Sequence, residues 1–152
     1  MIKCECFSYQ ADLLRAMVRL GVVKVGPDEN GHTALMDAAA ENTDPSYASV
    51  LIEVGSDVNA KDSQGRTALM YGAASNNNPD VLSVLIGAGA DINARDADGN
   101  TPLMLAARDN SADSIISFLI ENGADKSLAN NQGLKASDLV SEDRAASLAL
   151  LG

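Results

Sequence analysis

DSQGRTALMYGAASNNNPDVLSVLIGAGADINAR, residues 62–95, is the stretch that decides the fold of this chain, because it recurs almost position for position at a fixed offset. Threonine followed by x-Leu-Met opens the motif at Thr33, Thr67 and Thr101. A repeat this regular predicts a solenoid of stacked units, since one unit alone is too small to bury its apolar face. Two sets of glycines carry the step of 34 residues, namely Gly31, Gly65, Gly99 and Gly133, and Gly21, Gly55, Gly89 and Gly123.

The composition suits such a stack. The chain has 152 residues, a single-domain length, and 46% of them are hydrophobic, which is ample for a core. Aromatic residues make up 3% and tryptophan is absent. The core must therefore be built from Ala, Leu, Ile and Val, which favours thin helices packed closely together.

The charge excludes some classes of partner. A formal net charge of -10 opposes the binding of nucleic acid or an anionic membrane, because affinity for phosphates comes largely from neutralising them. Neither a signal peptide nor an apolar run of spanning length is present in the sequence. We therefore expect a soluble, cytoplasmic protein that binds no nucleic acid and no membrane.

The two cysteines, Cys4 and Cys6, give no metal site. On a helix this spacing points them to different faces, and no Cys or His cluster completes a ligand set. We interpret them as buried or idle thiols, with a redox or metal role as the alternative. No metal and no cofactor is expected.

Turn and cap residues predict two helices in each unit. Glycine turns at residues 31, 65 and 99 precede a threonine N-cap, and Pro102 is a favoured first helical residue. The first helices are expected over residues 34–41, 68–75 and 102–109. The second helices are expected over 45–54, 79–88 and 112–122, with N-caps at Asp44, Asn78 and Ser111 and left-handed glycine C-caps at Gly55, Gly89 and Gly123.

A single domain over residues 1–152 follows, with full units at 31–64, 65–98 and 99–132. Residues 1–30 are expected to form a partial first unit, with helices near 2–7 and 12–20. Either this is a natural N-terminal cap or a longer array has been cut there. Residues 133–152 are expected to form a C-terminal cap with a helix near 142–150, and Lys126 replaces the apolar Val58 and Ile92 as part of it.

The motifs resemble those of ankyrin repeat proteins. Gly-x-Thr-Ala/Pro-Leu-Met and Leu-Ile-x-x-Gly-Ala/Ser-Asp-Val/Ile-Asn-Ala-Lys/Arg-Asp are similar to the family pattern from Gly21 to about Leu139. The resemblance implies an all-α repeat solenoid of helix-turn-helix units joined by β-hairpin-like turns. The family's histidine in Thr-Pro-Leu-His is here Met36, Met70 and Met104, which replaces a polar contact between units with apolar packing. Asn59 and Asn93 occupy the family's hairpin asparagine, for which a structural role is expected over hydroxylation.

The resemblance also implies the function and its surface. We expect a non-enzymatic module, a monomer, that binds a partner protein or peptide through its concave face; no cluster of acid, base and nucleophile is present. Tyr71 and the arginines are the residue types that anchor interfaces. The rival hypothesis is a structural or spacer segment cut from a longer ankyrin-repeat protein. The expected face consists of Glu29, Asn30, His32, Asp37, Glu41, Lys61, Ser63, Gln64, Arg66, Tyr71, Ser75, Arg95, Ala97, Asp98, Asn100, Arg108 and Asp109.

Overall fold

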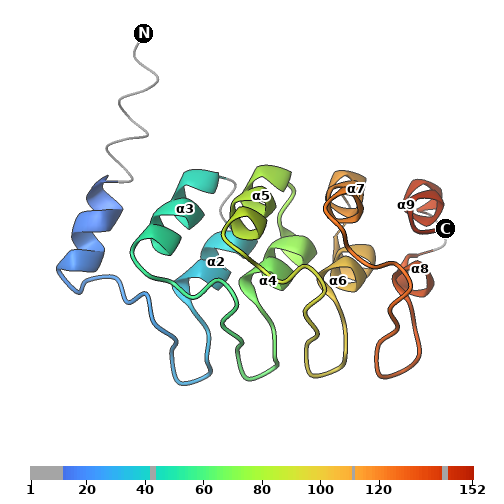
Figure 1. The fold of residues 1–152 in the computed structure, drawn as a ribbon, viewed down its shortest axis with the longest axis horizontal. Coiled ribbons are helices and arrows are strands. Elements are labelled where there is room, and N and C mark those ends of the chain that lie inside the picture. Colours follow the sequence, from blue (N-terminus) through green and yellow to red (C-terminus); the bar gives the residue numbers. More distant parts are fainter. Residues whose placement is uncertain (1–11, 42–43, 111, 142–143) are drawn as a thin grey trace, which may run out of the picture.

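The computed structural model describes residues 12–41, 44–110, 112–141 and 144–152 and shows a row of helix pairs in two layers (Figure 1). A helical segment over residues 12–19 begins the row. The inner layer contains α2 (Ala34–Glu41), α4 (Ala68–Ser75), α6 (Pro102–Asp109) and α8 (Ala136–Leu139). The outer layer contains α3 (Pro45–Glu53), α5 (Pro79–Gly87), α7 (Asp113–Glu121) and α9 (Ala145–Leu151). This arrangement confirms the all-α repeat solenoid.

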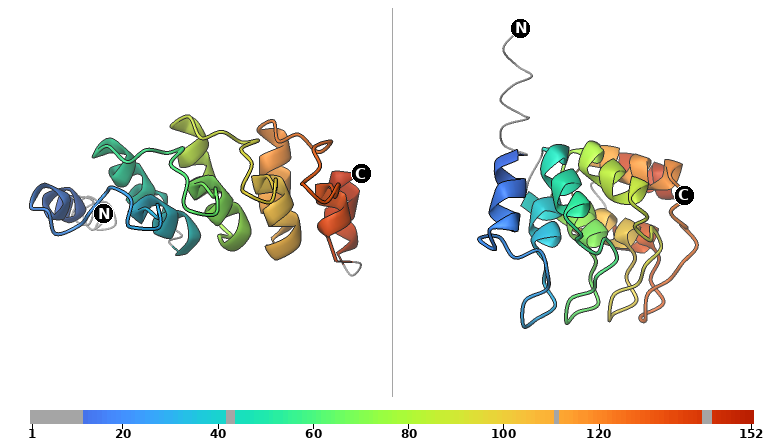
Figure 2. Two further views of the ribbon diagram at one scale, coloured as in Figure 1. Left: turned by 90° about the horizontal axis from the view of Figure 1, so that it is seen from below. Right: turned by 60° about the vertical axis from the view of Figure 1, so that its left-hand side comes forward.

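Long turns project from the inner layer, one beside the next (Figure 2). Each turn contains a glycine with a positive φ, for example 74° at Gly65 and 79° at Gly99, where a side chain would be strained. Neighbouring turns are joined at their tips by one backbone hydrogen bond each. The amides of Ser63, Ala97 and Asn131 donate to the carbonyls of Asn30, Gln64 and Asp98, at 2.7, 2.9 and 2.9 Å. In the described part of the protein the regular strand pairing of a sheet does not form, and only an isolated bridge joins Ala129 to Lys135.

The inner helices begin and end where the sequence predicts. The hydroxyls of Thr67 and Thr101 accept the backbone N–H three residues on, at 3.4 Å in both helices. At the C-terminal ends of α4 and α6 the backbone changes to an extended conformation at Asn76 and Asn110. The three predicted ranges, 34–41, 68–75 and 102–109, are thus confirmed.

The outer helices follow the same rule with small corrections. Asp44 and Asn78 cap α3 and α5 as predicted, since their side chains accept the amides of Ser46 and Asp80. The expected cap Ser111 is corrected to Ala112, which lies in the same repeat position but makes no capping hydrogen bond with its side chain. Ser111 itself lies outside the described residues.

Several expected boundaries also shift by one to three residues. The helices α3, α5 and α7 each end one residue early, because the residue before the terminating glycine leaves helical geometry, as at Ala88 with a ψ of 0°. The last helix begins at Ala145 rather than near residue 142, with Arg144 at its N-cap. The expected helix over 2–7 lies outside the described residues, whereas 12–19 is helical close to the predicted 12–20.

The core runs along the row between the two layers. Leu51, Leu85 and Leu119 occupy one repeat position and are each 0% exposed, so they line up as predicted. The inner helices pack in series, α2 on α4, α4 on α6 and α6 on α8. The methionines that replace the family's histidine are also fully buried, with Met36 and Met70 at 0% and Met104 at 1% exposure. Close packing of this kind makes truncation of one such leucine to alanine cost about 2–5 kcal/mol.

Buried amides join one unit to the next at the ends of the inner helices. Asn76 donates from its side chain to the carbonyl of Ala39 at 2.8 Å. Asn110 repeats this contact one unit on, with Ala73 at 2.9 Å and also with Asn76 at 2.7 Å. Both asparagines are almost fully buried. The side chains of these two asparagines therefore form a ladder of hydrogen bonds that joins each unit to the one before it.

A second ladder runs through the arms after the outer helices. The side chain of Asn59 donates to the carbonyl of Gly89 and accepts the amide of Asp91, both at 2.9 Å. Asn93 makes the same pair of contacts with Gly123 and Asp125. Each asparagine side chain thus pairs one backbone carbonyl and one backbone N–H of the following arm. These two contacts give a structural reason for asparagine at this position.

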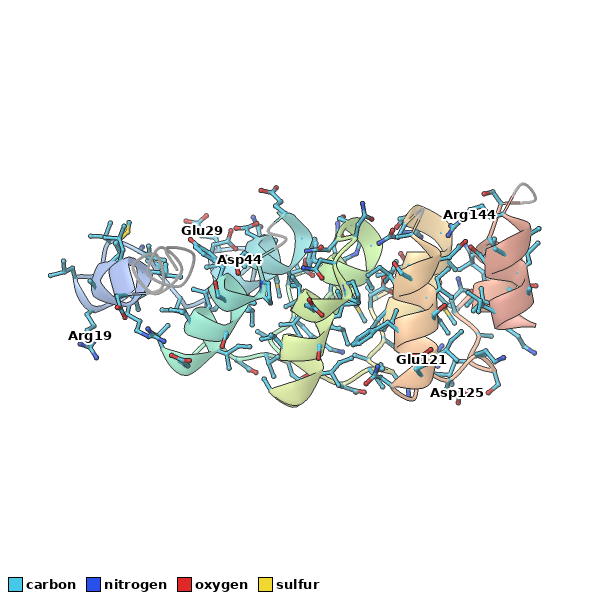
Figure 3. The ribbon with its side chains drawn as sticks, turned by 90° about the horizontal axis from the view of Figure 1, so that it is seen from above. Arg19, Glu29, Asp44, Glu121, Asp125 and Arg144 are labelled. Atoms are coloured by element: carbon cyan, nitrogen blue, oxygen red, sulfur yellow. The ribbon has the colours of Figure 1, made fainter. Side chains whose placement is uncertain are left out.

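Basic residues take over these contacts at the C-terminal end. Arg144 donates to the carbonyl of Ala107 at 2.9 Å, the repeat equivalent of Ala39 and Ala73, and it lies between α7 and α9 in the view of Figure 3. Lys126 donates to the carbonyls of Leu150 and Gly152 at the C-terminal end of α9. A cation at the C-terminus of a helix is favourable because the carbonyls there are partly negative.

Candidate functional site

The expected face is formed by the turn tips and the exposed sides of α2, α4 and α6, which lie next to one another along the row (Figure 2). His32, Arg66 and Tyr71 are half-buried, and Asn100 is buried with 3% exposure. The other thirteen of the seventeen residues of the expected face are exposed, namely Glu29, Asn30, Asp37, Glu41, Lys61, Ser63, Gln64, Ser75, Arg95, Ala97, Asp98, Arg108 and Asp109.

Each of the first three turns is held by an aspartate whose carboxylate points back into its own loop, and the fourth is held in the same way by the side-chain oxygen of Asn130. One oxygen of Asp62 accepts the amides of Gln64 and Arg66, both at 2.9 Å. Asp96 does the same for the amides of Asp98 and Asn100. These carboxylates therefore shape the tips that carry the site, and their recurrence in the sequence reflects turn chemistry.

Tyr71 ties α4 to the second turn. Its hydroxyl donates to the free oxygen of Asp62 at 2.6 Å. Burial, this hydrogen bond and the Asp62 charge raise the pKa of Tyr71 to about 12, although Arg66 nearby lowers it. Burial raises the pKa of Asp62, but the Tyr71 hydroxyl and the turn amides outweigh it, so the pKa lies below its ordinary value.

The Tyr71 ring also contacts the first unit. It meets the ring of His32 edge to face, with centroids 5.2 Å apart and an interplanar angle of 89°. His32 in turn lies 2.7 Å from the Asp37 carboxylate through Nε2. An aromatic pair of this geometry is favourable beyond its buried area, and here it fixes two expected partner-binding side chains against each other.

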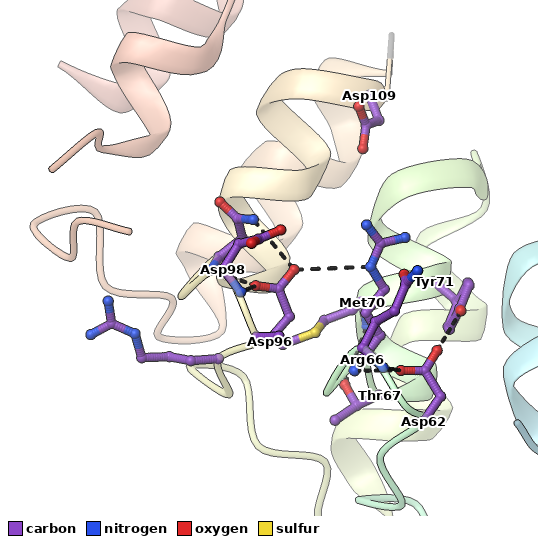
Figure 4. A network of polar contacts seen from close by, with 12 residues as sticks. Asp62, Arg66, Thr67, Met70, Tyr71, Asp96, Asp98 and Asp109 are labelled. Carbon is purple, nitrogen blue, oxygen red and sulfur yellow. Dashed lines mark hydrogen bonds and ion pairs between the residues drawn. The ribbon is translucent and has the colours of Figure 1, made fainter. Parts of the chain in front are cut away.

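Arg66 and Asp96 form the centre of the polar network between the second and third units (Figure 4). The Asp96 side chain is 2% exposed and its Oδ2 lies 3.9 Å from Arg66 Nε. Asn100 donates to Asp96 at 3.3 Å and accepts from Asn130 at 3.0 Å. Because Asn100 is buried within this network, it supports the surface from below and we do not include it in the surface a partner touches.

Three other cations of the face are already bonded within the protein. Lys61 donates to the carbonyl of Arg95 at 3.0 Å. Arg95 occupies the same position one unit on and donates to the carbonyls of Gly99 and Ala129. Arg108 places two nitrogens on the Asp109 carboxylate, at 2.8 and 2.7 Å, and this pairing more than offsets burial and raises its pKa. Sequence spacing alone did not reveal these bonds between neighbouring units.

Two hollows lie on this side of the molecule. One is lined by Ser63, Gln64, Arg66, Asp96, Ala97 and Asp98, between the second and third turns. The other lies beside the first turn and is lined by residues 24, 26–30, 32–34 and 37. Lys24, Gly26 and Pro27 were not expected at the site, because they belong to the arm that has lost the repeat pattern.

Metal chemistry finds no support in the described residues. They contain no group of three or more His, Cys, Asp or Glu placed to hold a metal ion. Cys4 and Cys6, for which buried or idle thiols are expected, lie outside the described residues. The helices described here are also too short and too polar for any of them to cross a lipid bilayer.

Comparison with known families agrees with this geometry. A family model of ankyrin repeats in three copies matches residues 2–96 and 72–142. A search of curated proteins gives no match. The family match, which covers most of the sequence, and the stacked helix pairs with projecting turns lead to one conclusion: the chain belongs to the ankyrin repeat family.

Proposed function

We propose that this chain binds a partner protein or peptide across its concave face and acts by holding or positioning that partner, without turnover. Ankyrin repeats are generally protein–protein interaction modules, and the family is typically non-enzymatic. The partner-binding surface consists of the turn tips and the exposed sides of α2, α4 and α6. We propose further that the protein acts as a cytoplasmic monomer that binds neither nucleic acid nor membrane.

One observation carries this proposal. The repeated residues are almost all used by the fold, as caps, turn aspartates, buried leucines and bridging asparagines. The exposed positions on the inner side differ from unit to unit, for example Glu41, Ser75 and Asp109 at the ends of α2, α4 and α6. Where the scaffold is generic, specificity has to come from such side chains.

The dimensions of the face suit a protein ligand. A stable interface buries about 800 Å² on each partner, which takes some 20–30 residues. Four turns and the inner helices lie in one continuous row, so a partner of that size contacts several units at once. The tip hydrogen bonds between turns hold this surface in one shape before binding, which reduces the entropy that binding would cost.

The test compares one substitution on two faces. Ser75→Arg adds a long cation to the exposed end of α4 on the concave face, whereas Ser83→Arg adds it to the exposed side of α5 in the outer layer. The immobilised protein is used to recover proteins from an extract of the native host, and each recovered protein is then purified and titrated for affinity. We expect Ser75→Arg to weaken binding at least about tenfold, a loss of about 1.4 kcal/mol, and Ser83→Arg to leave it within about twofold.

Equal binding by both variants would reject the concave face. Recovery of no protein that binds the purified ankyrin protein would reject the proposed function and favour the structural or spacer role. Circular dichroism and a urea titration of both variants show whether each is folded, so that loss of binding is not confused with loss of structure.

A further inference from the structure

The basic side chains of the concave face differ in whether their hydrogen-bond donors are still available to a partner. Lys61 and Arg95 donate to carbonyls of the next unit, and Arg108 is forked onto Asp109. Arg66 lies beside Tyr71, with which its side chain shares a hydrogen bond that lowers the Tyr71 pKa, and its charged contact within the described residues is the 3.9 Å approach to Asp96. Its Nε is buried and has no hydrogen-bond partner.

Two carboxylates that interact with Arg66, those of Asp62 and Asp96, already accept other hydrogen bonds. Asp62 accepts two amides of its own turn and the Tyr71 hydroxyl. Asp96 accepts two amides of its turn and the Asn100 side chain. Neither can turn to form the two parallel bonds that a guanidinium makes with a carboxylate without breaking its own turn. Asp96 therefore balances the charge of Arg66 without forming this pair of parallel bonds with it.

The position of Arg66 is nevertheless well defined. Its side chain is 31% exposed, so most of its length is packed between the units, and the Asp96 charge lies behind it. It lines the hollow between the second and third turns, together with Ser63, Gln64 and Asp98. A planar guanidinium held in this way is organised before a ligand arrives, which favours bidentate recognition of an anion.

We propose that Arg66 is the anchor of the concave face and binds a carboxylate of the partner, from an Asp or Glu side chain or the C-terminus of a peptide, in the hollow between the second and third turns. This inference rests on the proposed function and names the chemistry of one contact in it. The exposed Asp98 on the rim repels a second negative charge, as does the net charge of -10, so the site suits a single carboxylate in preference to a phosphate group.

The experiment starts from peptides that are chosen without bias. A phage-displayed library of random peptides is selected on the folded full-length protein, and the best binders are synthesised and titrated by calorimetry. For each peptide, every Asp and Glu is replaced in turn by Asn or Gln, and the C-terminus is amidated. Each peptide is measured against the wild type, Arg66→Gln, Arg66→Lys, Arg19→Gln and Ser75→Arg. Arg19 is an exposed arginine on the 12–19 helix that points away from the stack (Figure 3), and its loss is the control for charge.

We expect one carboxylate whose neutralisation weakens binding to the wild type about fivefold or more but weakens binding to Arg66→Gln less than twofold. These limits correspond to a coupling of at least about 2.5-fold, which lies within the range that exposed and partly exposed charge pairs give. Arg66→Lys should retain part of the effect, because an ammonium keeps the charge and loses the fork. Arg19→Gln should leave both affinities as in the wild type.

The other outcomes separate the two proposals. One result would reject the Arg66 proposal and keep the concave face. It is a set of peptides that bind Ser75→Arg more weakly, but whose affinity depends on no carboxylate or is unchanged in Arg66→Gln. Peptides that bind through Lys or Arg, or a preference for phosphorylated peptides, also overturn it. If the peptides bind Ser75→Arg as well as the wild type, or if the library yields no binding peptide, both the concave face and the Arg66 proposal are rejected. A urea titration confirms that Arg66→Gln is folded at the temperature of the measurements.

Discussion

Asp62 shows how one side chain of the repeat serves both the fold and the surface. One carboxylate oxygen closes the turn and the other accepts the Tyr71 hydroxyl. The lowered pKa of Asp62 means that the charged form is favoured in the folded state. Its contribution to stability is therefore present above its ordinary value of 3.8 and is lost as the pH falls through the lower folded value.

Tyr71, which donates this hydrogen bond, gives a prediction at high pH. The pKa of Tyr71 rises from 10.0 to about 12 on folding, so the unfolded protein loses this proton first and stability declines as the pH rises from 10.0 towards about 12. In an ultraviolet titration of the folded protein, one tyrosine should ionise near the top of that range. Tyr71→Phe should remove that step, whereas Tyr47→Phe, which changes an exposed ring, should leave it. A late step that persists in Tyr71→Phe would contradict the assignment.

Two glycines with the same φ allow the cost of backbone strain to be distinguished from the cost of a steric contact. Gly99 and Gly133 both have a φ of 79°, but only at Gly99 would a Cβ meet backbone, the Asn131 nitrogen at 3.0 Å. Gly133→Ala should cost about 1–2 kcal/mol through the left-handed conformation alone. Gly99→Ala should cost more, because the neighbouring turn must also move. Urea unfolding measures both, and equal losses would show that the tips are not in close contact.

At the scale of the elements, the ends of the inner helices carry the contacts between units. Asn76 is 2% exposed, and its amide is the hydrogen-bond donor to the Ala39 carbonyl of the preceding unit. Asn77 beside it is exposed. The two residues have the same side chain, and they differ in whether that side chain joins two helices.

Replacement of each by alanine should therefore give different losses of stability. Asn76→Ala leaves a buried carbonyl without its donor and should lower the free energy of unfolding by about 1–3 kcal/mol. Asn77→Ala should change it by no more than about 0.5 kcal/mol, as is usual for a surface site. Urea titrations followed by circular dichroism measure both, and a similar loss in both variants would mean that the ladder contributes little.

The buried methionines also concern the packing of one element on another. The residue types of the repeat indicated soft packing at Met36, Met70 and Met104, and all three are fully buried at the contact between inner helices. A histidine there brings polar nitrogens that need partners. In this protein the contacts between units are instead made by the asparagine amides at the helix ends and in the arms.

At the scale of the whole molecule, stability in a stack comes from neighbours, so the two ends have fewer stabilising contacts than the middle. The 12–19 helix is joined to α3 by an exposed ion pair between Arg15 and Glu53. In its arm, Val25 stands where Asn59 and Asn93 bridge the later units. The first junction therefore lacks one of the two bridging ladders.

Amide hydrogen exchange should show this as a gradient. We expect the slowest exchange in α4 and α6, which pack on an inner helix on both sides, and the fastest among the helices in residues 12–19. Arg15→Ala should speed exchange in residues 12–19 slightly and leave α6 unchanged, since an exposed ion pair stabilises only weakly and acts locally. Uniform protection along the row would indicate that the array unfolds as a single unit and would contradict the gradient.

The sequence by itself determined the class of fold, the positions of the helices and the row of buried leucines. These follow from local chemistry that repeats, since glycine, threonine, proline and the apolar residues on one face of each helix have the same conformational preferences in every unit. It also predicted the concave surface, through resemblance to a family. The N-cap that it placed wrongly, at Ser111, lies where the third unit departs from the Asp-Pro or Asn-Pro pattern, and the C-caps expected at Gly55, Gly89 and Gly123 lie one residue earlier.

Only the tertiary structure decided which side chains of that surface are still available to a partner. Lys61, Arg95 and Arg66 have the same charge and similar exposed positions in the sequence pattern, yet two of them bond to the next unit and one does not. Their acceptors are backbone carbonyls brought within reach by stacking, at residues 34 positions away in the sequence. Residue type sets what a side chain is able to bond, whereas the neighbouring unit sets whether a partner atom is already there.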